Sequence, residues 1–401
     1  MKLEDYKNAI RSAFPRHARR GMINATGCDK LYDVVSETID AAEKSLLPEG
    51  KYADLFTLCN WTFRMWSRFE MDDFYGQTGY LTFNIAQLWD TIYRDGQESL
   101  PHDEMLTSLL ETASDNVKDN MQDTIFDFLV LHFKSPEELA RKEEFFSQKI
   151  ESMKRETPPN DYLSLAEAGY MQILYELSRP IEQIRAVVRP GDLPVKTIKL
   201  GEIEAAYGNF PEAVDIFKKV IGDNPHPSES IRTNLMRAYQ GQGKKSAYHY
   251  ELLMLMLDYP EDLRYYQEYK RQWSETEWKK RWENILSNYP DKLPSIVRLL
   301  QEEGRYDLIM EAAEPADASI VKRFQEELFA LYPERCLKVW EADADHYAAE
   351  AKNRSDYESL ASRLKNIATH PGGEELAKEL AAKYKKQYPR KKALIEELSI
   401  F

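Results

Sequence analysis

Glycine and proline are scarce in this sequence of 401 residues, which has 16 glycines and 19 prolines, about 9% of the chain together. Soluble proteins average roughly 12% for the two residue types combined. Because turns depend on glycine and proline, a chain with few of them has long elements joined by short connections. This shortage argues against a protein of many short strands and favours long helices.

Long hydrophobic runs and closely spaced cysteines are also missing. No run of about 18 apolar residues occurs, so we expect no membrane span. The first twenty residues are polar, without the apolar core of a secretory signal. The three cysteines, Cys28, Cys59 and Cys336, lie far apart. They cannot form a disulfide framework and are typical of a buried, structural role in a cytoplasmic protein.

Basic residues are fewer than acidic ones, 54 against 68, which gives a net charge of −14. Residues 101–150 carry −6 and residues 301–350 carry −8, whereas residues 351–401 carry +4. A uniformly acidic surface repels nucleic acid. The total charge therefore disfavours nucleic-acid binding, but the basic C-terminal end leaves it open.

Helix signals run along the whole chain. Residues 52–70 carry apolar side chains mostly at spacings of three and four residues, which form one stripe on a helix. Capping boxes begin at Ser135, Ser274 and Ser355. No alternating strand pattern bounded by Asn-Gly or Asp-Gly turns occurs. The sequence predicts an all-α fold of about twenty helices with little or no sheet.

Two proline-containing breaks interrupt this helical pattern, at residues 158–161 and 189–194. The first is the better candidate for a domain boundary. We expect a helical N-terminal region over 1–157, a repeat region over 158–315, and a C-terminal helical region with a basic tail over 316–401.

One segment, residues 194–227, fits a tetratricopeptide repeat (TPR), a helical hairpin of about 34 residues. We expect its small residues to let two helices approach closely, with Phe217 in the groove between them. The matching positions are Leu200, Gly201, Gly208, Phe210, Ala213, Phe217 and Pro225.

Two weaker echoes of the repeat follow. The first has Ala238, Gly243 and Ala247, with Gly243 one residue out of step, and the second is centred on Gly304. The resemblance implies a right-handed α-solenoid of TPR-like hairpins with a concave face.

The C-terminal end has a narrower resemblance. Residues 357–364, 371–376 and 384–398, together with 69–73, Gly76 and Gly79, resemble parts of the helical region of bacterial SWIM zinc-finger proteins. The defining Cys-x-Cys and Cys-x-His pairs are missing, so the resemblance implies a helical scaffold and carries over neither zinc binding nor the proposed DNA role of the finger.

Several motifs have structural explanations that we prefer. Residues 241–246 lack the spacing and the preceding strand of a phosphate-binding loop. Asp343, His346 and Glu350 share a helix face, but no second helix offers matching metal ligands. No nucleophile-elbow or zinc-protease motif occurs. We therefore expect no cofactor, no metal and no enzymatic activity.

Glu70, Asp72 and Asp73 lie where a helix end disfavours negative charge. A turn or cap, a bound cation and a partner contact each explain them. Our hypothesis is that pairing of Arg68 with Asp72 holds this loop.

Aromatic and basic residues alternate over residues 262–282, including Tyr266, Lys279 and Arg281. A helical core, a protein interface and a nucleic-acid surface are all open explanations. The basic run over 383–392, including Lys385, Lys386 and Arg390, fits a solvated helix end, an intramolecular contact or an acidic partner.

The function that these patterns favour is a non-enzymatic scaffold that binds a protein or peptide in the concave groove of the repeats. The predicted groove residues are Lys199, Asn234, Arg237 and Tyr239. The alternative is an accessory subunit of a nucleic-acid-acting complex, which would use residues 279–281 and the basic tail.

Overall fold

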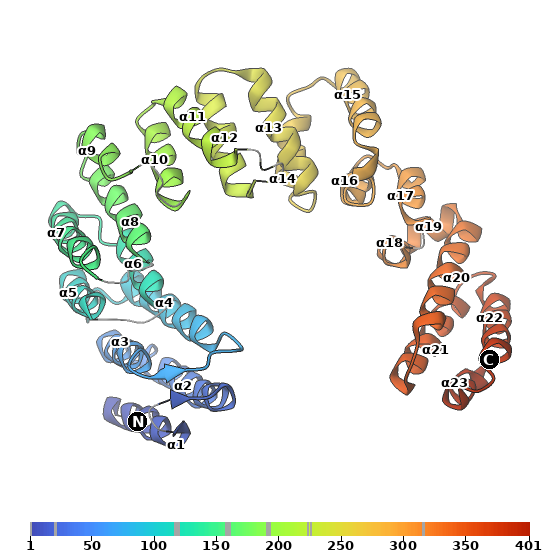
Figure 1. Ribbon diagram of the computed structural model, residues 1–401, viewed down its shortest axis with the longest axis horizontal. Coiled ribbons are helices and arrows are strands. Elements are labelled where there is room, and N and C mark those ends of the chain that lie inside the picture. Colours follow the sequence, from blue (N-terminus) through green and yellow to red (C-terminus); the bar gives the residue numbers. More distant parts are fainter. Residues whose placement is uncertain are drawn as a thin grey trace. The chain divides into compact units, whose positions relative to one another are not determined.

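The fold was examined in a computed structural model that describes residues 2–19, 22–115, 121–156, 162–189, 194–222, 224, 227–314 and 317–401. These residues contain 23 α-helices, two short 3-10 helices and three strands of two residues each (Figure 1). The predicted all-α class is confirmed. The chain divides into two compact units, residues 1–226 and 227–401, which we describe separately.

The first unit contains eleven of the described helices and the three strands. Its elements are α1 Leu3–His17, β1 Ala18–Arg19, β2 Met22–Ile23, α2 Ala25–Leu46, α3 Tyr52–Trp66, β3 Glu70–Met71, α4 Gln77–Asp95, α5 His102–Ser114, α6 Met121–Leu131, α7 Pro136–Met153, α8 Leu163–Glu176, α9 Ile181–Arg185, α10 Pro194–Ala206 and α11 Phe210–Ile221.

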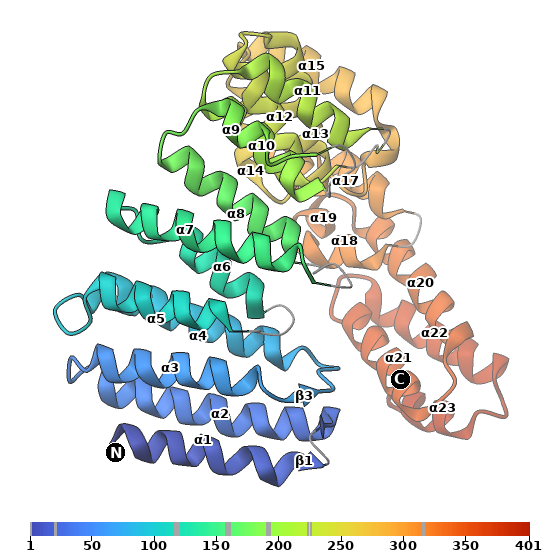
Figure 2. The same ribbon diagram turned by 60° about the vertical axis from the view of Figure 1, so that its left-hand side comes forward.

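Helices of the first unit pack in two layers. Helices α2, α4, α6, α8 and α10 each contact the next in that series, and α1, α3, α5 and α7 do the same. Consecutive helices such as α1–α2 and α7–α8 join the two series. Figure 2 shows the helices from α1 to α8 stacked one above another. We call the two series the even layer and the odd layer.

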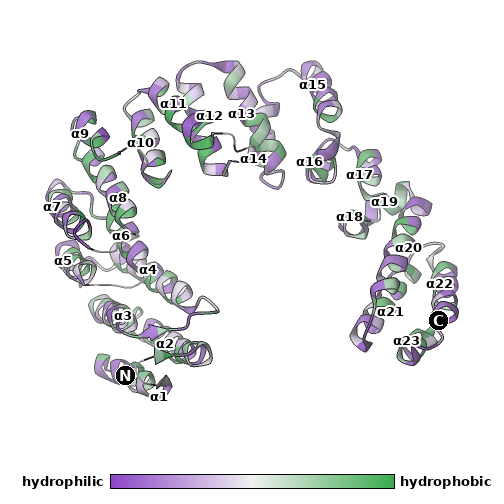
Figure 3. Ribbon diagram, in the orientation of Figure 1, coloured by the Kyte–Doolittle hydropathy of each residue, from purple (hydrophilic) through white to green (hydrophobic). Residues whose placement is uncertain are grey.

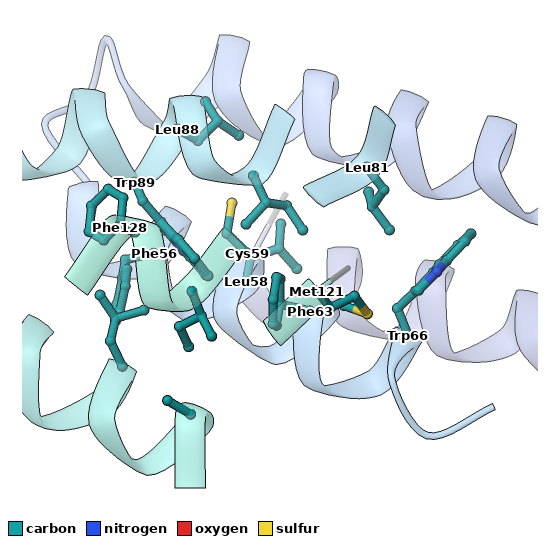
Figure 4. Packing of buried hydrophobic residues seen from close by; sticks show 14 of the residues in the cluster. Phe56, Leu58, Cys59, Phe63, Trp66, Leu81, Leu88, Trp89, Met121 and Phe128 are labelled. Atoms are coloured by element: carbon teal, nitrogen blue, oxygen red, sulfur yellow. The ribbon is translucent and has the colours of Figure 1, made fainter. Parts of the chain in front are cut away.

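Amphipathic helices explain this layering. Most helices of the unit carry hydrophobic and hydrophilic residues side by side along their length (Figure 3), so each can bury one stripe against its neighbours. Figure 4 shows the resulting core around Phe63, Trp66, Trp89 and Phe128, which are almost completely buried. Cys59 lies in the same core, and burial raises the pKa of its thiol.

Capping fixes where several helices begin. Ser135 and Glu138 form the predicted capping box of α7, with Pro136 in its first turn. The box predicted at Ser355 is wrong by two residues, because the N-cap of the corresponding helix is Asn353, paired with Asp356.

The loop before α4 is not held as we expected. Arg68 and Asp72 form no ion pair in the part of the chain that the structure describes. Instead, β3 pairs with β2, and the Asp73 carboxylate accepts a hydrogen bond of 3.0 Å from the backbone N–H of Thr78 in the first turn of α4. Of the explanations that the sequence left open, the structure therefore contains the turn and cap, in which the Asp73 carboxylate is the hydrogen-bond acceptor.

Helices α10 and α11 form the hairpin predicted over residues 194–227. A Cβ atom on Gly201 would lie 2.8 Å from the ring of Phe217, so only glycine permits this approach. Phe217 and Ala213 are completely buried. Gly208 has a φ of 83° in the turn. Pro225 lies outside the described residues, as do 158–161 and most of the second predicted break.

The second unit contains the remaining twelve helices of the described chain. Its elements are α12 Glu229–Gly241, α13 Lys245–Asp258, α14 Leu263–Lys270, α15 Glu275–Asn288, η1 Pro290–Lys292, α16 Val297–Glu302, α17 Tyr306–Ala313, α18 Ala318–Arg323, α19 Gln325–Leu331, α20 Pro333–Glu350, α21 Arg354–Ala368, α22 Gly373–Gln387, α23 Lys392–Glu397 and η2 Leu398–Ile400.

The same turn recurs in both units. Gly208, Gly243 and Gly304 each have a positive φ and follow the last turn of a helix. In each case the backbone N–H of the residue after the glycine donates a hydrogen bond to the carbonyl oxygen five residues before that donor. For example, the N–H of Lys244 donates to the carbonyl oxygen of Tyr239 at 3.0 Å. This is the hydrogen bond of a Schellman helix end, in which glycine avoids the Cβ penalty of a left-handed residue.

None of the described helices is both long and apolar enough to cross a membrane. The boundary between the two compact units, at residues 226 and 227, lies within the segment that we expected to form one repeat region, 158–315.

Candidate functional site

A groove of about 1100 Å³ crosses the even layer of the first unit. Its lining comes from three helices, α2, α4 and α6, and from the residue after α6. The midpoints of these helices lie about 40 to 90 residues apart in the sequence. Because the odd layer contributes no lining residue, the groove lies on the face of the even layer that points away from it.

Two large apolar side chains of the groove are exposed. Phe83 on α4 is 60% exposed and Leu131 at the end of α6 is 68% exposed. Tyr80, one helical turn before Phe83, is also exposed, and its ring lies 6.4 Å from that of Tyr32 on α2. Exposed aromatic residues next to a hollow surface are typical of interaction sites.

Carboxylates dominate the charge of the groove. Asp90 forms an ion pair of 3.1 Å with Arg94, and its other oxygen lies 3.6 Å from Nε2 of His132. The other four form no ion pair with any described residue. The five acidic lining residues are Asp40, Glu43, Asp90, Asp123 and Asp127.

Asp123 and Asp127 lie close enough to repel each other. Burial, and secondarily the charge of Asp127, raise the pKa of Asp123 to about 6. Its Oδ1 atom is buried and accepts no hydrogen bond in the described structure. Burial also raises the pKa of Asp127, while the positive charge of Lys199 acts in the opposite direction. The groove therefore holds negative charge that its own surroundings stabilise poorly.

Positive charge is sparse in the same place. Burial lowers the pKa of His132, with the charge of Asp90 opposing this effect, so its imidazole is neutral at pH 7. Among the described lining residues, Arg94 is the one permanent cation, and Asp90 already engages it.

Of the predicted groove residues, Lys199 lies beside this site. It is on α10 in the even layer, pairs with Glu202 at 2.7 Å, and acts electrostatically on Asp127. Asn234, Arg237 and Tyr239 lie on α12 in the second unit. Arg237 is exposed and Asn234 is partly exposed, but Tyr239 is buried and therefore contributes to packing.

The alternating segment over residues 262–282 buries most of its aromatic side chains within the second unit, whereas many of its polar and charged residues are exposed. Tyr266 is 4% exposed and its hydroxyl donates a hydrogen bond to Glu303. Lys279 pairs with Glu275 at 3.0 Å on the surface of α15. Arg281 lies 3.7 Å from the ring centre of Trp273 and donates to the Tyr269 hydroxyl. Arg281 thus covers one face of Trp273, which is then not available for stacking with a nucleobase.

The basic tail is divided between internal and free charges. Lys383 binds Asp345 at 2.7 Å, and Lys391 donates to the carbonyl oxygen of Ala351. The three tail residues that we predicted to bind a partner, Lys385, Lys386 and Arg390, form no ion pair within the described chain. Lys386 and Arg390 are exposed and Lys385 is partly exposed.

The three residues considered as metal ligands do not come together as one site. Asp343 pairs with Arg363, while His346 and Glu350 are exposed and 3.8 Å apart. No group of three histidine, cysteine or acidic side chains in the described part of the chain is arranged to hold a metal ion.

A second cavity, of about 950 Å³, lies between α18, α20 and α21. It mixes charges of both signs: Lys322 and Arg363 line it together with Asp317, Asp343 and Glu358. Its Arg363 is already paired with Asp343. This cavity therefore mixes two basic with three acidic side chains and lacks the one-sided charge of the groove.

Sequence reasoning missed the acidic groove. The available signal was the strongly acidic block over 101–150, which contains Asp123 and Asp127, but Asp40 and Phe83 lie in other segments. Only the packing of α2, α4 and α6 brings them together. No protein family profile matches the chain, and no curated protein sequence matches it either.

Proposed function

We propose that this protein is a non-enzymatic helical-repeat scaffold, a right-handed α-solenoid of TPR-like hairpins, which binds another protein through the groove on α2, α4 and α6. The even and odd layers support the solenoid, because repeated helical pairs bury their apolar faces by stacking on their neighbours. The recurring glycine turn and the close contact of Gly201 with Phe217 support the TPR-like hairpin.

A single observation carries the binding role. The groove exposes Phe83 and Leu131 beside four carboxylates that form no ion pair with any described residue. Leaving apolar surface and unpaired charge together on a folded chain costs stability, and functional surfaces are where proteins retain such costs. A partner that covers the groove removes both.

Buried thiols support a non-enzymatic role. Cys28 and Cys336 are buried, and burial is the main cause that raises their pKa values to about 12 and about 11. A thiol that stays protonated at neutral pH is a poor nucleophile.

Site-specific photocrosslinking tests the binding role. We would place p-benzoylphenylalanine at Gln87, an exposed groove residue of α4, and at Glu111, an exposed residue of α5 in the odd layer. Irradiation in the native host should give discrete protein adducts from position 87 only. Adducts from neither position, or equally from both, would overturn the proposal.

The second candidate is an accessory subunit of a nucleic-acid-acting complex. It is favoured by Lys385, Lys386 and Arg390, whose charges no described residue neutralises. Salt-dependent binding of DNA or RNA that is lost when these three residues become glutamine would support it. No binding at about 50 mM salt would discard it.

A further inference from the structure

The four unpaired carboxylates of the groove are spread over two helices and do not form a single cluster. Asp40 and Glu43 lie on α2, whereas Asp123 and Asp127 lie on α6, with α4 between them in the layer. No group of three such residues is arranged for a metal ion in the described chain. Negative charge distributed in this way matches several cations held apart from one another along one ligand.

The groove also sets the ligand's size and its apolar content. Adjacent packed helices lie about 9 Å apart, so three of them span about 20 Å. An extended peptide advances about 3.3 Å per residue, so about six residues cross the groove. Phe83 and Leu131 offer apolar contacts on two of the three helices. Alternate residues of an extended strand point to opposite sides, so every second side chain faces the groove, and cationic and apolar side chains both reach their sites when both kinds occur among those positions.

Resting on the proposed function, we propose that the occupant is an extended, cationic peptide segment of a partner protein, with lysine or arginine side chains interspersed with aromatic or aliphatic ones. Its cations pair with Asp40, Glu43 and Asp127. Its apolar side chains pack on Phe83 and Leu131. Nucleic acid does not fit this site, because its phosphates would meet the carboxylates.

Fluorescence anisotropy with a defined probe tests this chemistry. The probe is a fluorescein-labelled nonapeptide in which pairs of lysines alternate with pairs of phenylalanine or leucine, so that each face of the extended strand carries both kinds. The comparison peptide has serine at every apolar position. We expect the first peptide to bind at least about tenfold more tightly, since about 1.4 kcal/mol of apolar contact separates them. Equal binding of both peptides would overturn the apolar part of the proposal.

Two groove variants and one matched control identify the surface. Asp40→Asn combined with Glu43→Gln, and Phe83→Ser combined with Leu131→Ser, should each weaken probe binding about tenfold or more. The control, Glu104→Gln combined with Glu111→Gln, removes two exposed charges from α5 in the odd layer and should change the Kd less than twofold. A control that weakens binding as much as the acidic variant shows unspecific attraction and overturns the site.

Circular dichroism and thermal unfolding of each variant show whether the fold is retained. If Phe83→Ser combined with Leu131→Ser unfolds, Phe83→Thr alone serves, with about a threefold expected loss. Failure of the probe while crosslinks form at position 87 overturns the cationic partner and leaves the proposed function standing. Failure of both experiments removes both proposals.

Discussion

The groove on α2, α4 and α6 differs from the alternating segment over residues 262–282, called the aromatic segment below, in how the charged side chains find partners. Glu303, the residue after α16, accepts hydrogen bonds from three residues of the aromatic segment: from Tyr266, from Lys270 at 2.7 Å and from Trp278 at 2.8 Å. In the groove, Asp123 has a buried oxygen that accepts none in the described structure. The carboxylate packed against the conspicuous segment therefore has its hydrogen-bond partners within the second unit, whereas Asp123 in the inconspicuous groove lacks one, although the indole N–H groups of Trp273 and Trp282 are also buried without an acceptor in the described structure.

This difference follows from where each set of residues lies along the chain. Residues close together in sequence fall on one helical hairpin, where their aromatic and basic side chains pack against each other. A surface on stacked hairpins instead collects residues from every second helix. Conspicuous composition in one short segment thus indicates local packing, whereas a binding surface has no contiguous sequence signature.

The largest expected effect comes from Glu303→Ala, which removes the acceptor that three side chains of the aromatic segment share. Three donors lose their partner, two of them on the buried residues Tyr266 and Trp278, so the free energy of unfolding should fall by about 2–4 kcal/mol. Urea denaturation of the wild type and the variant measures this change in the free energy of unfolding. Glu302→Ala, which removes an exposed ion pair with Arg298, is the control and should cost less than about 1 kcal/mol.

The pH dependence of the same residue provides a second measurement. Burial by itself would raise the pKa of Glu303, but the hydrogen bonds from Lys270, Tyr266 and Trp278 outweigh it and hold the pKa below its usual value. A lowered folded-state pKa contributes stability above the unfolded-state pKa of about 4.3, and this stability is lost as the pH falls below it. Equal costs of Glu303→Ala and Glu302→Ala at pH 7 would contradict the comparison.

A smaller effect is expected for Arg281→Ala. The Arg281 guanidinium lies over the ring of Trp273 and donates a hydrogen bond of 3.0 Å to the Tyr269 hydroxyl. Loss of these contacts should lower the free energy of unfolding by about 1 kcal/mol. Lys280→Ala, at an exposed neighbouring position, should cost less than about 0.5 kcal/mol. If Arg281→Ala instead left stability unchanged and reduced binding of RNA or DNA, the segment would be an interface and the comparison would fail.

Whether a feature can be predicted from the sequence depends on how far apart its residues lie along the chain. The glycine turns at 208, 243 and 304, the contact of Gly201 with Phe217 and the capping box at Ser135 follow from local spacing, and the structure contains them. The expected pairing of Arg68 with Asp72 failed because strand pairing, which local sequence does not indicate, holds that loop. The groove could not be predicted, because it depends on which helices become neighbours.

The smallest expected effect is a pH-dependent gain from Asp123→Asn in the groove. A folded-state pKa of about 6 means that the folded protein binds more protons than the unfolded one between about pH 4 and pH 6. Wild-type stability therefore falls as the pH rises through this window, and the ionised carboxylate opposes folding at pH 7. Because Asp123 is partly exposed, Asp123→Asn should raise the unfolding free energy at pH 7 by no more than about 1 kcal/mol.

This gain should shrink towards pH 4, where Asp123 is protonated in the folded protein and about half protonated in the unfolded one. Thermal unfolding of both proteins from pH 4 to pH 8 measures the difference, and Glu104→Gln on the odd layer serves as the control variant. A stabilised Asp123→Asn protein that also binds the cationic probe more weakly would show that the groove retains this charge for its ligand at the expense of stability. A loss of stability at pH 7 would instead mean that the carboxylate supports the fold, and the contrast between the groove and the aromatic segment would disappear.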